Sequence, residues 1–188
     1  MKYTQDYFSR NIPLFTEHLK ELKGKPDVLF LEVGTYEGRS AIWLLENILT
    51  HESARLHIID PFDDSPIEDI NTDYSMIRKN FTENIEPYKE KIMLMQDVSE
   101  NAWPKLLENK YDAVYIDGSH MACSVLLDAV MSWVALKKGG IIIFDDYQWG
   151  AGKPPHLRPK LAIDAFLEAY TGQYELLNKS YQVIIKKL

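Results

Sequence analysis

Five short, nearly continuous apolar runs recur along the 188-residue chain, and they restrict its fold more than any other feature. The runs are rich in Val, Ile, Leu and Phe, and they occupy residues 28–33, 56–59, 92–95, 113–116 and 141–144. Such runs are typical of strands buried on both faces of a parallel sheet. Amphipathic helix patterns lie between them, at residues 41–49, 74–85 and 123–136. This alternation predicts right-handed strand-helix-strand units and a doubly wound α/β sheet.

The two ends of the chain follow other patterns. Residues 14–22 form an amphipathic helix pattern that ends at "GKP", inside an N-terminal helical segment of residues 1–25. After the fifth run come a Gly/Pro-rich stretch, a helix pattern at residues 162–170 and two strands in "YELLNKSYQVIIKKL". The length suits one core and is too short for two, so we expect a single domain over residues 1–188.

Charge and composition exclude several classes of partner. The net charge is -7, the isoelectric point is near 5.2, and the chain has no Lys/Arg run, so nucleic acid and anionic membranes would be repelled. The single cysteine, Cys123, cannot form an internal disulfide, which fits a reducing compartment. The sequence shows neither a stretch of transmembrane length nor the apolar core of a signal peptide. We therefore expect a cytoplasmic protein.

A glycine turn follows the first apolar run, in "LFLEVGTYEGRSAIWLL". Ligands of open parallel sheets bind beyond the carboxyl ends of the strands, where Gly34 and Gly38 lie. A dinucleotide fingerprint would also need glycines at positions 36 and 39, but Tyr36 and Arg39 stand there. The nearby Glu32 disfavours a phosphate and favours a cation. At the end of the second run, Asp60 can accept both hydroxyls of a ribose. Together these features favour S-adenosylmethionine, a cationic adenosine derivative without phosphate.

The glycine turn, Asp60 and the "QD" after the third run resemble class I S-adenosylmethionine-dependent methyltransferases over residues 28–146. The resemblance implies a mostly parallel seven-stranded sheet with an antiparallel last strand. It also implies a set of residues that line the cofactor: Glu32, Gly34, Tyr36, Gly38, Ser40, Asp60, Asp97, Val98 and Asp117. Alternatively, the glycines only make a tight turn and Asp60 only caps a strand. The correct order of the three features at three successive strand ends favours the cofactor.

Three carboxylates end the fourth and fifth runs, Asp117 after the fourth and Asp145 with Asp146 after the fifth. Parallel strands lie about 4.8 Å apart, so these side chains can converge on one ion. An all-oxygen set favours Mg²⁺ or another hard divalent cation, and we predict Asp117, Asp145 and Asp146 as its ligands. The alternative is that the acidic pair caps the strand and is solvated.

His120 follows Asp117 by three residues and is the predicted catalytic base. We expect Ser119 to cap the next helix and His120 to lie in its first turn, where the positive helix end favours a neutral imidazole. A divalent cation acidifies a bound hydroxyl, and a nearby histidine takes the proton. The alternative is a surface histidine at a helix start.

The Asp-x-x-His pattern followed by an acidic pair resembles the metal-dependent O-methyltransferases of natural-product sugars, including the macrolide-sugar enzymes. Those enzymes have a Glu at the position of Asp145, whose shorter reach makes its ligand role the least supported. They also carry a long N-terminal extension. The loop at residues 147–159 is predicted to cover the site, with Tyr147, Trp149 and His156 available to pack on a substrate ring. A plain connector is the equal alternative.

The sequence thus predicts an O-methyltransferase that uses S-adenosylmethionine and a divalent cation to methylate a hydroxyl of a small molecule or saccharide. A nicotinamide-dependent oxidoreductase and a non-catalytic cofactor-binding member are the two alternatives. Tyr36 and Arg39 argue against the first, and the set of Asp117, His120 and Asp146 argues against the second. The identity of the acceptor and the oligomeric state, a homo-oligomer included, stay open.

Overall fold

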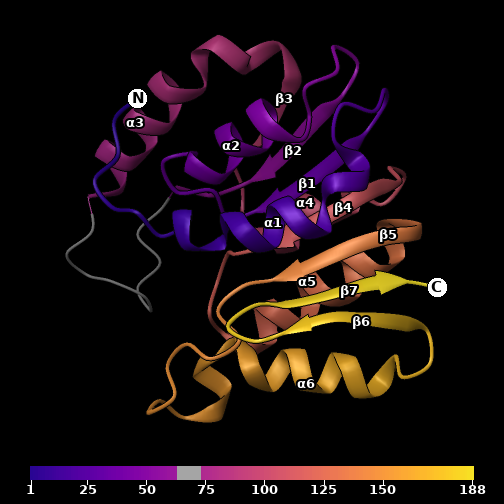
Figure 1. The fold of residues 1–188 in the computed structure, drawn as a ribbon. Helices are drawn as coiled ribbons and strands as arrows, with labels where there is room; N and C mark the ends of the chain where they lie inside the picture. Colours follow the sequence, from indigo (N-terminus) through magenta and orange to yellow (C-terminus); the bar gives the residue numbers. More distant parts are fainter. Residues whose placement is uncertain (63–72) are drawn as a thin grey trace.

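One seven-stranded sheet runs through the molecule in the order β3-β2-β1-β4-β5-β7-β6 (Figure 1). The computed structural model describes residues 1–62 and 73–188. The strands are β1 Leu29–Val33, β2 Arg55–Ile59, β3 Ile92–Met95, β4 Tyr111–Ile116, β5 Leu136–Phe144, β6 Tyr174–Lys179 and β7 Val183–Lys187. Strands β1 to β5 pair in parallel, and β7 is antiparallel to both β5 and β6. The predicted doubly wound sheet with its antiparallel last strand is confirmed.

Helices cover both faces of the sheet. They are α1 Ile12–His18, α2 Arg39–Asn47, α3 Tyr74–Ile85, α4 Ser99–Leu106, α5 Ala122–Ala135 and α6 Pro159–Ala169. Short 3₁₀ turns occupy Ser9–Asn11, Lys20–Leu22, Glu86–Lys91 and Pro155–Leu157. Helix α4 is missing from the sequence-based prediction, because it has only 8 residues and contains Pro104. In the described part of the chain, no helix combines the length and the apolar character needed to cross a bilayer.

Two apolar clusters pack against opposite faces of the sheet, which explains why the strands are apolar without alternation. Phe30 of β1 packs in one cluster with Leu44 of α2 and Phe81 of α3. Its neighbour Leu31 packs in the other cluster with Trp103 of α4 and other residues of α5 and α6. Successive strand residues point to opposite faces, so every position of a doubly covered strand is buried.

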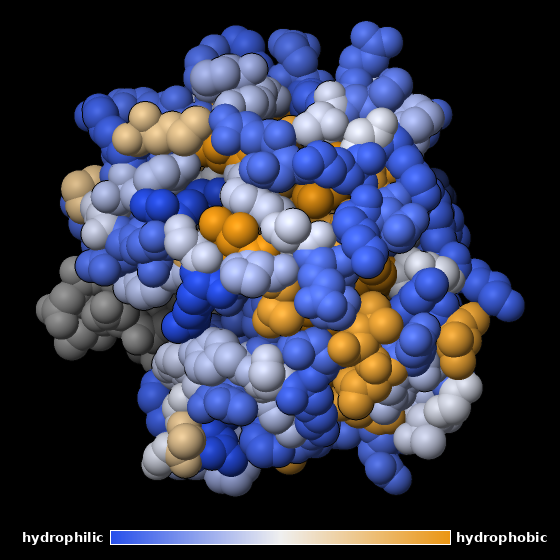
Figure 2. All heavy atoms as spheres, viewed as in Figure 1, coloured by the Kyte–Doolittle hydropathy of each residue, from blue (hydrophilic) through white to orange (hydrophobic). Residues whose placement is uncertain are grey.

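The carboxyl ends of the parallel strands meet at one edge of the sheet, which lies on the left in Figure 1. The chain order reverses between β1 and β4, which are hydrogen-bonded neighbours. Such a switch point is where open α/β sheets bind their ligands. The outer surface seen in Figure 2 is mostly hydrophilic, with apolar residues gathered over β6 and β7. The candidate site therefore has to be sought at the strand ends.

Candidate active site

Gly34 ends β1 at the switch point, in a left-handed conformation with φ +81°. A Cβ at this position would lie 2.1 Å from the carbonyl oxygen of Asp117, which follows β4. No side chain fits that gap, since real Cβ contacts are never so short. The backbone of Asp117 thus accounts for this glycine without any ligand. Gly34 still brings the glycine turn directly against the end of β4.

Glu32 is fully buried at the end of β1. Its Oε2 accepts a hydrogen bond of 2.9 Å from the hydroxyl of Thr35, while its Oε1 has no hydrogen-bond partner among the described residues. Burial raises the pKa of Glu32 to about 7, against the lowering effect of the Ser40 and Thr35 hydroxyls, and Asp60 adds to the rise. An unpaired buried acceptor is costly, so it marks a place where a ligand with a donor group would be stabilised.

Asp60 holds the backbone of the glycine turn. Its Oδ2 accepts hydrogen bonds from the amides of Thr35 at 2.8 Å and Tyr36 at 3.1 Å, and its Oδ1 accepts one from Phe62 at 2.9 Å. Tyr36 has a φ of +53°, which is rare for a non-glycine residue. The carboxylate therefore stabilises an unusual turn at the place where a ribose is predicted to bind.

The remaining predicted cofactor residues lie at the starts of α2 and α4. Gly38 caps α2 with φ +79°, and a Cβ there would approach Phe81 at 3.1 Å. Ser40 is buried in the first turn of α2. Asp97 accepts hydrogen bonds of 2.9 Å from the amide of Val98 and from Asn101, and Val98 is exposed. Each of these residues thus lies at a carboxyl strand end or at the helix that follows it.

Asp117, Asp145 and Asp146 form an acidic cluster at the ends of β4 and β5. The buried hydroxyl of Tyr115 lies between two of them, 2.8 Å from Asp117 Oδ2 and in hydrogen-bond contact with Asp145 Oδ2. Desolvation and the charges of Asp145 and Asp146 raise the pKa of Asp117 well above its usual range. The three carboxylates therefore lie close enough for the charges of Asp145 and Asp146 to act on Asp117.

Asp145 is held by protein donors from distant parts of the chain. Its Oδ2 accepts hydrogen bonds from Asn11 Nδ2 at 2.8 Å and Gln182 Nε2 at 3.0 Å, in addition to that of Tyr115. Its Oδ1 accepts the amide of Asp146 at 2.7 Å. Burial and the charge of Asp146 still raise the pKa of Asp145. Three donors saturate one oxygen, which fits a supporting role better than direct contact with an ion.

Asp146 connects the cluster with His120. Its Oδ2 lies 2.8 Å from His120 Nε2, and its Oδ1 accepts a hydrogen bond of 2.6 Å from the Tyr181 hydroxyl. A nitrogen of Arg10 lies 3.7 Å from the same Oδ1. Burial opposes ionisation, but these hydrogen bonds and the positive charges outweigh it and hold the pKa of Asp146 below its usual value. Asp146 is therefore the member of the cluster whose pKa is lowered, whereas the pKa values of Asp117 and Asp145 are raised.

His120 lies in the loop before α5, and the predicted helix cap is wrong. Helix α5 begins at Ala122 with Met121 as its N-cap, and the Ser119 hydroxyl accepts the amide of Met121 at 3.1 Å. The Asp-Gly-Ser-His stretch forms an irregular loop, which leaves His120 outside the helical turn. The contact with Asp146 positions the imidazole.

Trp149 covers the imidazole. The two rings stack with centroids 4.1 Å apart at 25°, and Lys153 Nζ lies 3.9 Å from the centroid of the Trp149 ring. Trp149 therefore packs on His120 in this structure. Tyr147 is buried and donates a hydrogen bond to Asp164, so its ring belongs to the core beside α6, whereas His156 is exposed. Within the predicted covering loop, Trp149 is the aromatic residue that contacts the site.

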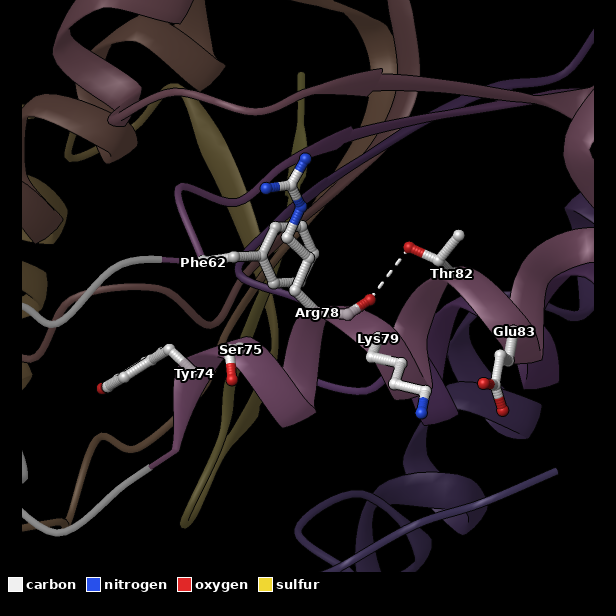
Figure 3. A pocket seen from close by; sticks show the side chains of 7 residues that line it. All are labelled: Phe62, Tyr74, Ser75, Arg78, Lys79, Thr82 and Glu83. Atoms are coloured by element: carbon white, nitrogen blue, oxygen red, sulfur yellow. Dashed lines mark hydrogen bonds between the residues drawn. The ribbon is translucent and has the colours of Figure 1, made fainter.

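A small cavity lies between His120 and the acidic cluster. It measures about 10 Å³, room for about one water-sized group, and is lined by residues 116–120, Val125, residues 144–146 and Pro159. A separate open groove of about 640 Å³ follows the outer side of α3 (Figure 3). Phe62, Tyr74, Arg78 and Lys79 are among its lining residues, and none of the predicted site residues is. The acidic cluster and His120 thus line the small cavity and not the groove.

The donor set can be compared with the needs of a divalent cation. Within residues 1–62 and 73–188, no group of three or more His, Cys, Asp or Glu side chains is arranged to hold a metal ion. Mg²⁺ is usually held by only one or two protein carboxylates, with water and substrate oxygens completing its shell. Asp117 and Asp146, which both line the small cavity, would be the two carboxylates to hold it.

Sequence analysis missed five residues that contact the cluster: Arg10, Asn11, Tyr115, Tyr181 and Gln182. Tyr115 is a polar group in an otherwise apolar run, which could have signalled a role at the strand end. The other four lie in segments far from the motifs and carried no such signal.

Comparison with known proteins identifies the family. A model described as a methyltransferase domain matches residues 31–147, more than half of the chain. The chain therefore belongs to this methyltransferase family. It is also 29% identical over 150 residues to an uncharacterized protein of Acanthamoeba polyphaga mimivirus, covering 77% of the chain and 64% of that relative. The chain thus spans less than two thirds of the relative's length.

Solved structures confirm the class I methyltransferase fold. The O-methyltransferase from Bacillus cereus in complex with SAH gives a TM-score of 0.71 at 13% identity, over 100% of this chain and 84% of that chain. The O-methyltransferase TomG from Streptomyces achromogenes, in complex with SAM, gives a TM-score of 0.69 at 14% identity. The match covers 97% of this chain and 81% of that chain. MycE, a methyltransferase of the mycinamycin biosynthetic pathway in complex with Mg, SAH and mycinamycin VI, gives a TM-score of 0.66 at 14% identity. The match covers 97% of this chain and 50% of that chain. The predicted class of protein is confirmed.

Proposed function

We propose that this protein is an O-methyltransferase that transfers the methyl group of S-adenosylmethionine to a hydroxyl of a small molecule or saccharide, with His120 as the base. The contact between His120 Nε2 and Asp146 Oδ2, beside the acidic cluster and next to the glycine turn, carries this proposal. Solved structures of similar fold with SAM, SAH, Mg or mycinamycin VI in their names support it. The cytoplasmic location stays a prediction.

The glycine turn suits a cationic cofactor. The unpaired Glu32 Oε1 is a buried acceptor that can receive a donor such as an ammonium group. Asp60 fixes the turn through the amides of Thr35 and Tyr36. S-adenosylmethionine, when bound, supplies a sulfonium methyl group, and the acceptor oxygen forms a bond to this methyl as the bond between sulfur and carbon breaks. Glu32, Gly34, Tyr36, Gly38, Ser40, Asp60, Asp97, Val98 and Asp117 are the proposed cofactor-binding residues.

His120 takes the proton that the acceptor hydroxyl loses. The carboxylate of Asp146 lies 2.8 Å from Nε2 of the ring and so holds the imidazole at the edge of the acidic cluster. A base that is oriented by a carboxylate follows the general logic of nucleophile activation. The stacked Trp149 fixes the plane of the imidazole. Such general-base catalysis contributes about 10²–10⁴-fold to the rate.

A hard divalent cation is part of the proposal. Asp117 and Asp146 would hold it, and Asp145 is the least supported ligand, because three protein donors share its Oδ2 whereas each oxygen of Asp146 has one hydrogen-bond partner. A bound divalent cation supplies positive charge that lowers the pKa of a coordinated hydroxyl. The mutual repulsion in the cluster favours a cation there.

Transfer of a labelled methyl group from S-adenosylmethionine to a panel of sugar, phenol and catechol acceptors tests this function. We expect a hydroxyl acceptor to be labelled, the label to be lost with EDTA, and added Mg²⁺ to restore it. Labelling that is indifferent to EDTA would remove the cation from the proposal. Labelling of nitrogen or carbon only would contradict the O-methyltransferase assignment.

A further inference from the structure

Residues 2–11, here called the N-terminal strap, cross the edge of the sheet where the proposed site lies. Figure 1 shows this indigo segment running from beside α3 to α1. The backbone of Lys2 is fixed to α3, since its amide donates to Asn84 Oδ1 at 2.7 Å and its carbonyl accepts from Asn84 Nδ2 at 2.8 Å. One end of the strap is therefore anchored on the helix that follows β2.

The middle of the strap contacts the glycine turn. The amide of Thr4 donates to the buried carboxylate of Glu37 at 2.6 Å, and the Thr4 hydroxyl lies 3.1 Å from the Tyr36 hydroxyl. The ring of Tyr7 packs edge-on against Tyr36, with centroids 5.5 Å apart. Asp6 pairs with Arg39 at 3.4 Å. The strap thus touches the turn at Tyr36, a proposed cofactor residue, and at Glu37 and Arg39 after it.

The far end of the strap reaches the acidic cluster. Asn11 is only 3% exposed, and its Nδ2 donates to Asp145 Oδ2 at 2.8 Å across 134 positions of sequence. Arg10 lies over the ring of Tyr181 at 4.4 Å and within 3.7 Å of Asp146 Oδ1. These two residues therefore contact the carboxylate that supports the cluster and the carboxylate that orients His120.

We propose that Arg10 and Asn11 are positioning residues of the methyl-transfer site, and that the strap couples the cofactor turn to the acidic cluster. This inference rests on the proposed function. Because the strap binds both places, a ligand that orders the turn stabilises the docked strap, and a docked strap strengthens ligand binding by the same factor. Asn11 acts through Asp145, and Arg10 acts through Asp146.

Limited proteolysis with chymotrypsin measures strap docking. The ring of Tyr7 is 59% exposed and offers a cleavage site inside the strap. Saturating S-adenosylhomocysteine should slow cleavage after Tyr7 by about fivefold or more, the lower range of typical couplings between sites. Cleavage that is unchanged or faster with S-adenosylhomocysteine would overturn the proposal. Mass spectrometry of the products identifies the cut.

Calorimetry with S-adenosylhomocysteine measures the reverse effect. Asn11→Asp places a second carboxylate against Asp145 and should weaken binding by about fivefold or more, although position 11 does not touch the glycine turn. Arg10→Gln is the milder variant, since Arg10 is largely exposed and its removal leaves the core intact; it should weaken binding in the same direction. Lys20→Gln, on the exposed side after α1, is the control and should bind as the wild type does.

The outcomes separate the two proposals. If S-adenosylhomocysteine does not bind the wild-type protein, the proposed function fails, and the inference fails with it. If it binds the wild type and both strap variants with equal affinity, the function stands and only the coupling is contradicted. Circular dichroism and thermal unfolding of each variant show whether it is folded. Should Asn11→Asp not fold, the affinity of Arg10→Gln decides.

Discussion

The imidazole of His120 and the carboxylate of Asp146 meet at 2.8 Å between Nε2 and Oδ2, although they follow different strands. The pairing places a base at the edge where the glycine turn and the acidic cluster converge. Asp146 therefore orients His120, in addition to any contact with a cation.

Replacing His120 with Ala should leave S-adenosylhomocysteine affinity near that of the wild type and slow methyl transfer by about 10²-fold or more. The reason is that the imidazole accepts the proton of the acceptor but lies outside the glycine turn. Single-turnover transfer of labelled methyl to an acceptor from the screen measures the rate. His51→Ala, before β2 at the opposite edge of the sheet, is the matched control. Full activity of His120→Ala would mean that another group is the base.

Replacing Asp60 with Ala should weaken S-adenosylhomocysteine binding by about 10-fold or more, because the amides of Thr35 and Tyr36 lose their acceptor. The turn would then no longer be held in its unusual conformation. Calorimetric titration gives the affinity. Asp164→Ala on α6 serves as the control and should bind normally. An unchanged affinity in Asp60→Ala would remove Asp60 from the cofactor site.

Gly34→Ala should destabilise the fold far more than Gly172→Ala. Both glycines have φ near +80°, but a Cβ at Gly34 meets the Asp117 carbonyl at 2.1 Å, whereas a Cβ at Gly172 meets nothing within 4 Å. Both alanine variants therefore suffer the backbone strain of a positive φ, but only Gly34→Ala also suffers a steric clash. Urea unfolding should show a difference of about 2 kcal/mol or more, or no folded Gly34→Ala protein at all. An equal loss of stability in the two variants would show that the backbones of residues 34 and 117 can move apart at little cost in free energy.

Asp128 should make stability depend on pH. Its side chain is buried in α5 and accepts a hydrogen bond from Trp103 Nε1 at 2.8 Å. Burial raises its pKa from the ordinary value of 3.8 to about 6, against the hydrogen bonds from Trp103 and Ser99. Because the folded state binds the proton more tightly, the contribution of Asp128 to stability falls as pH rises from about 4 to 6 and is constant above that range.

Asp128→Asn keeps an acceptor for Trp103 and removes the titration. Relative to the wild type, the variant should therefore gain about 1–3 kcal/mol of stability between pH 4 and pH 7. Urea unfolding of both proteins over this range provides the measurement. A stability difference that does not vary with pH would show that Asp128 is ionised in the folded protein at low pH.

The five parallel strands could be predicted from sequence because their signals are local. Apolar runs without alternation require two covered faces, and Phe30 and Leu31 show this directly by packing in opposite clusters. The carboxylates at the strand ends then converge, because parallel strands place their ends at one edge. Asp117, Asp145 and Asp146 are close for this reason alone.

The residues that hold the acidic cluster in place could not be predicted, because tertiary packing brings them there from distant parts of the chain. Nothing in the sequence near Asn11 indicates a partner 134 positions away at Asp145. The expected cap at Ser119 failed for a related reason. The loop after Asp117 is drawn toward Asp146 by His120, and α5 begins only at Ala122. The sequence leaves Trp149 either to pack on a substrate ring or to lie in a plain connector, and in the structure it stacks on His120.

Calorimetric titration of the wild-type protein with S-adenosylhomocysteine, and separately with NAD, tests the central claim most directly. The glycine turn has Tyr36 and Arg39 where a pyrophosphate would need glycines, and it carries the buried Glu32. We therefore predict saturable binding of S-adenosylhomocysteine and none of NAD. Binding of NAD without binding of S-adenosylhomocysteine would contradict the account.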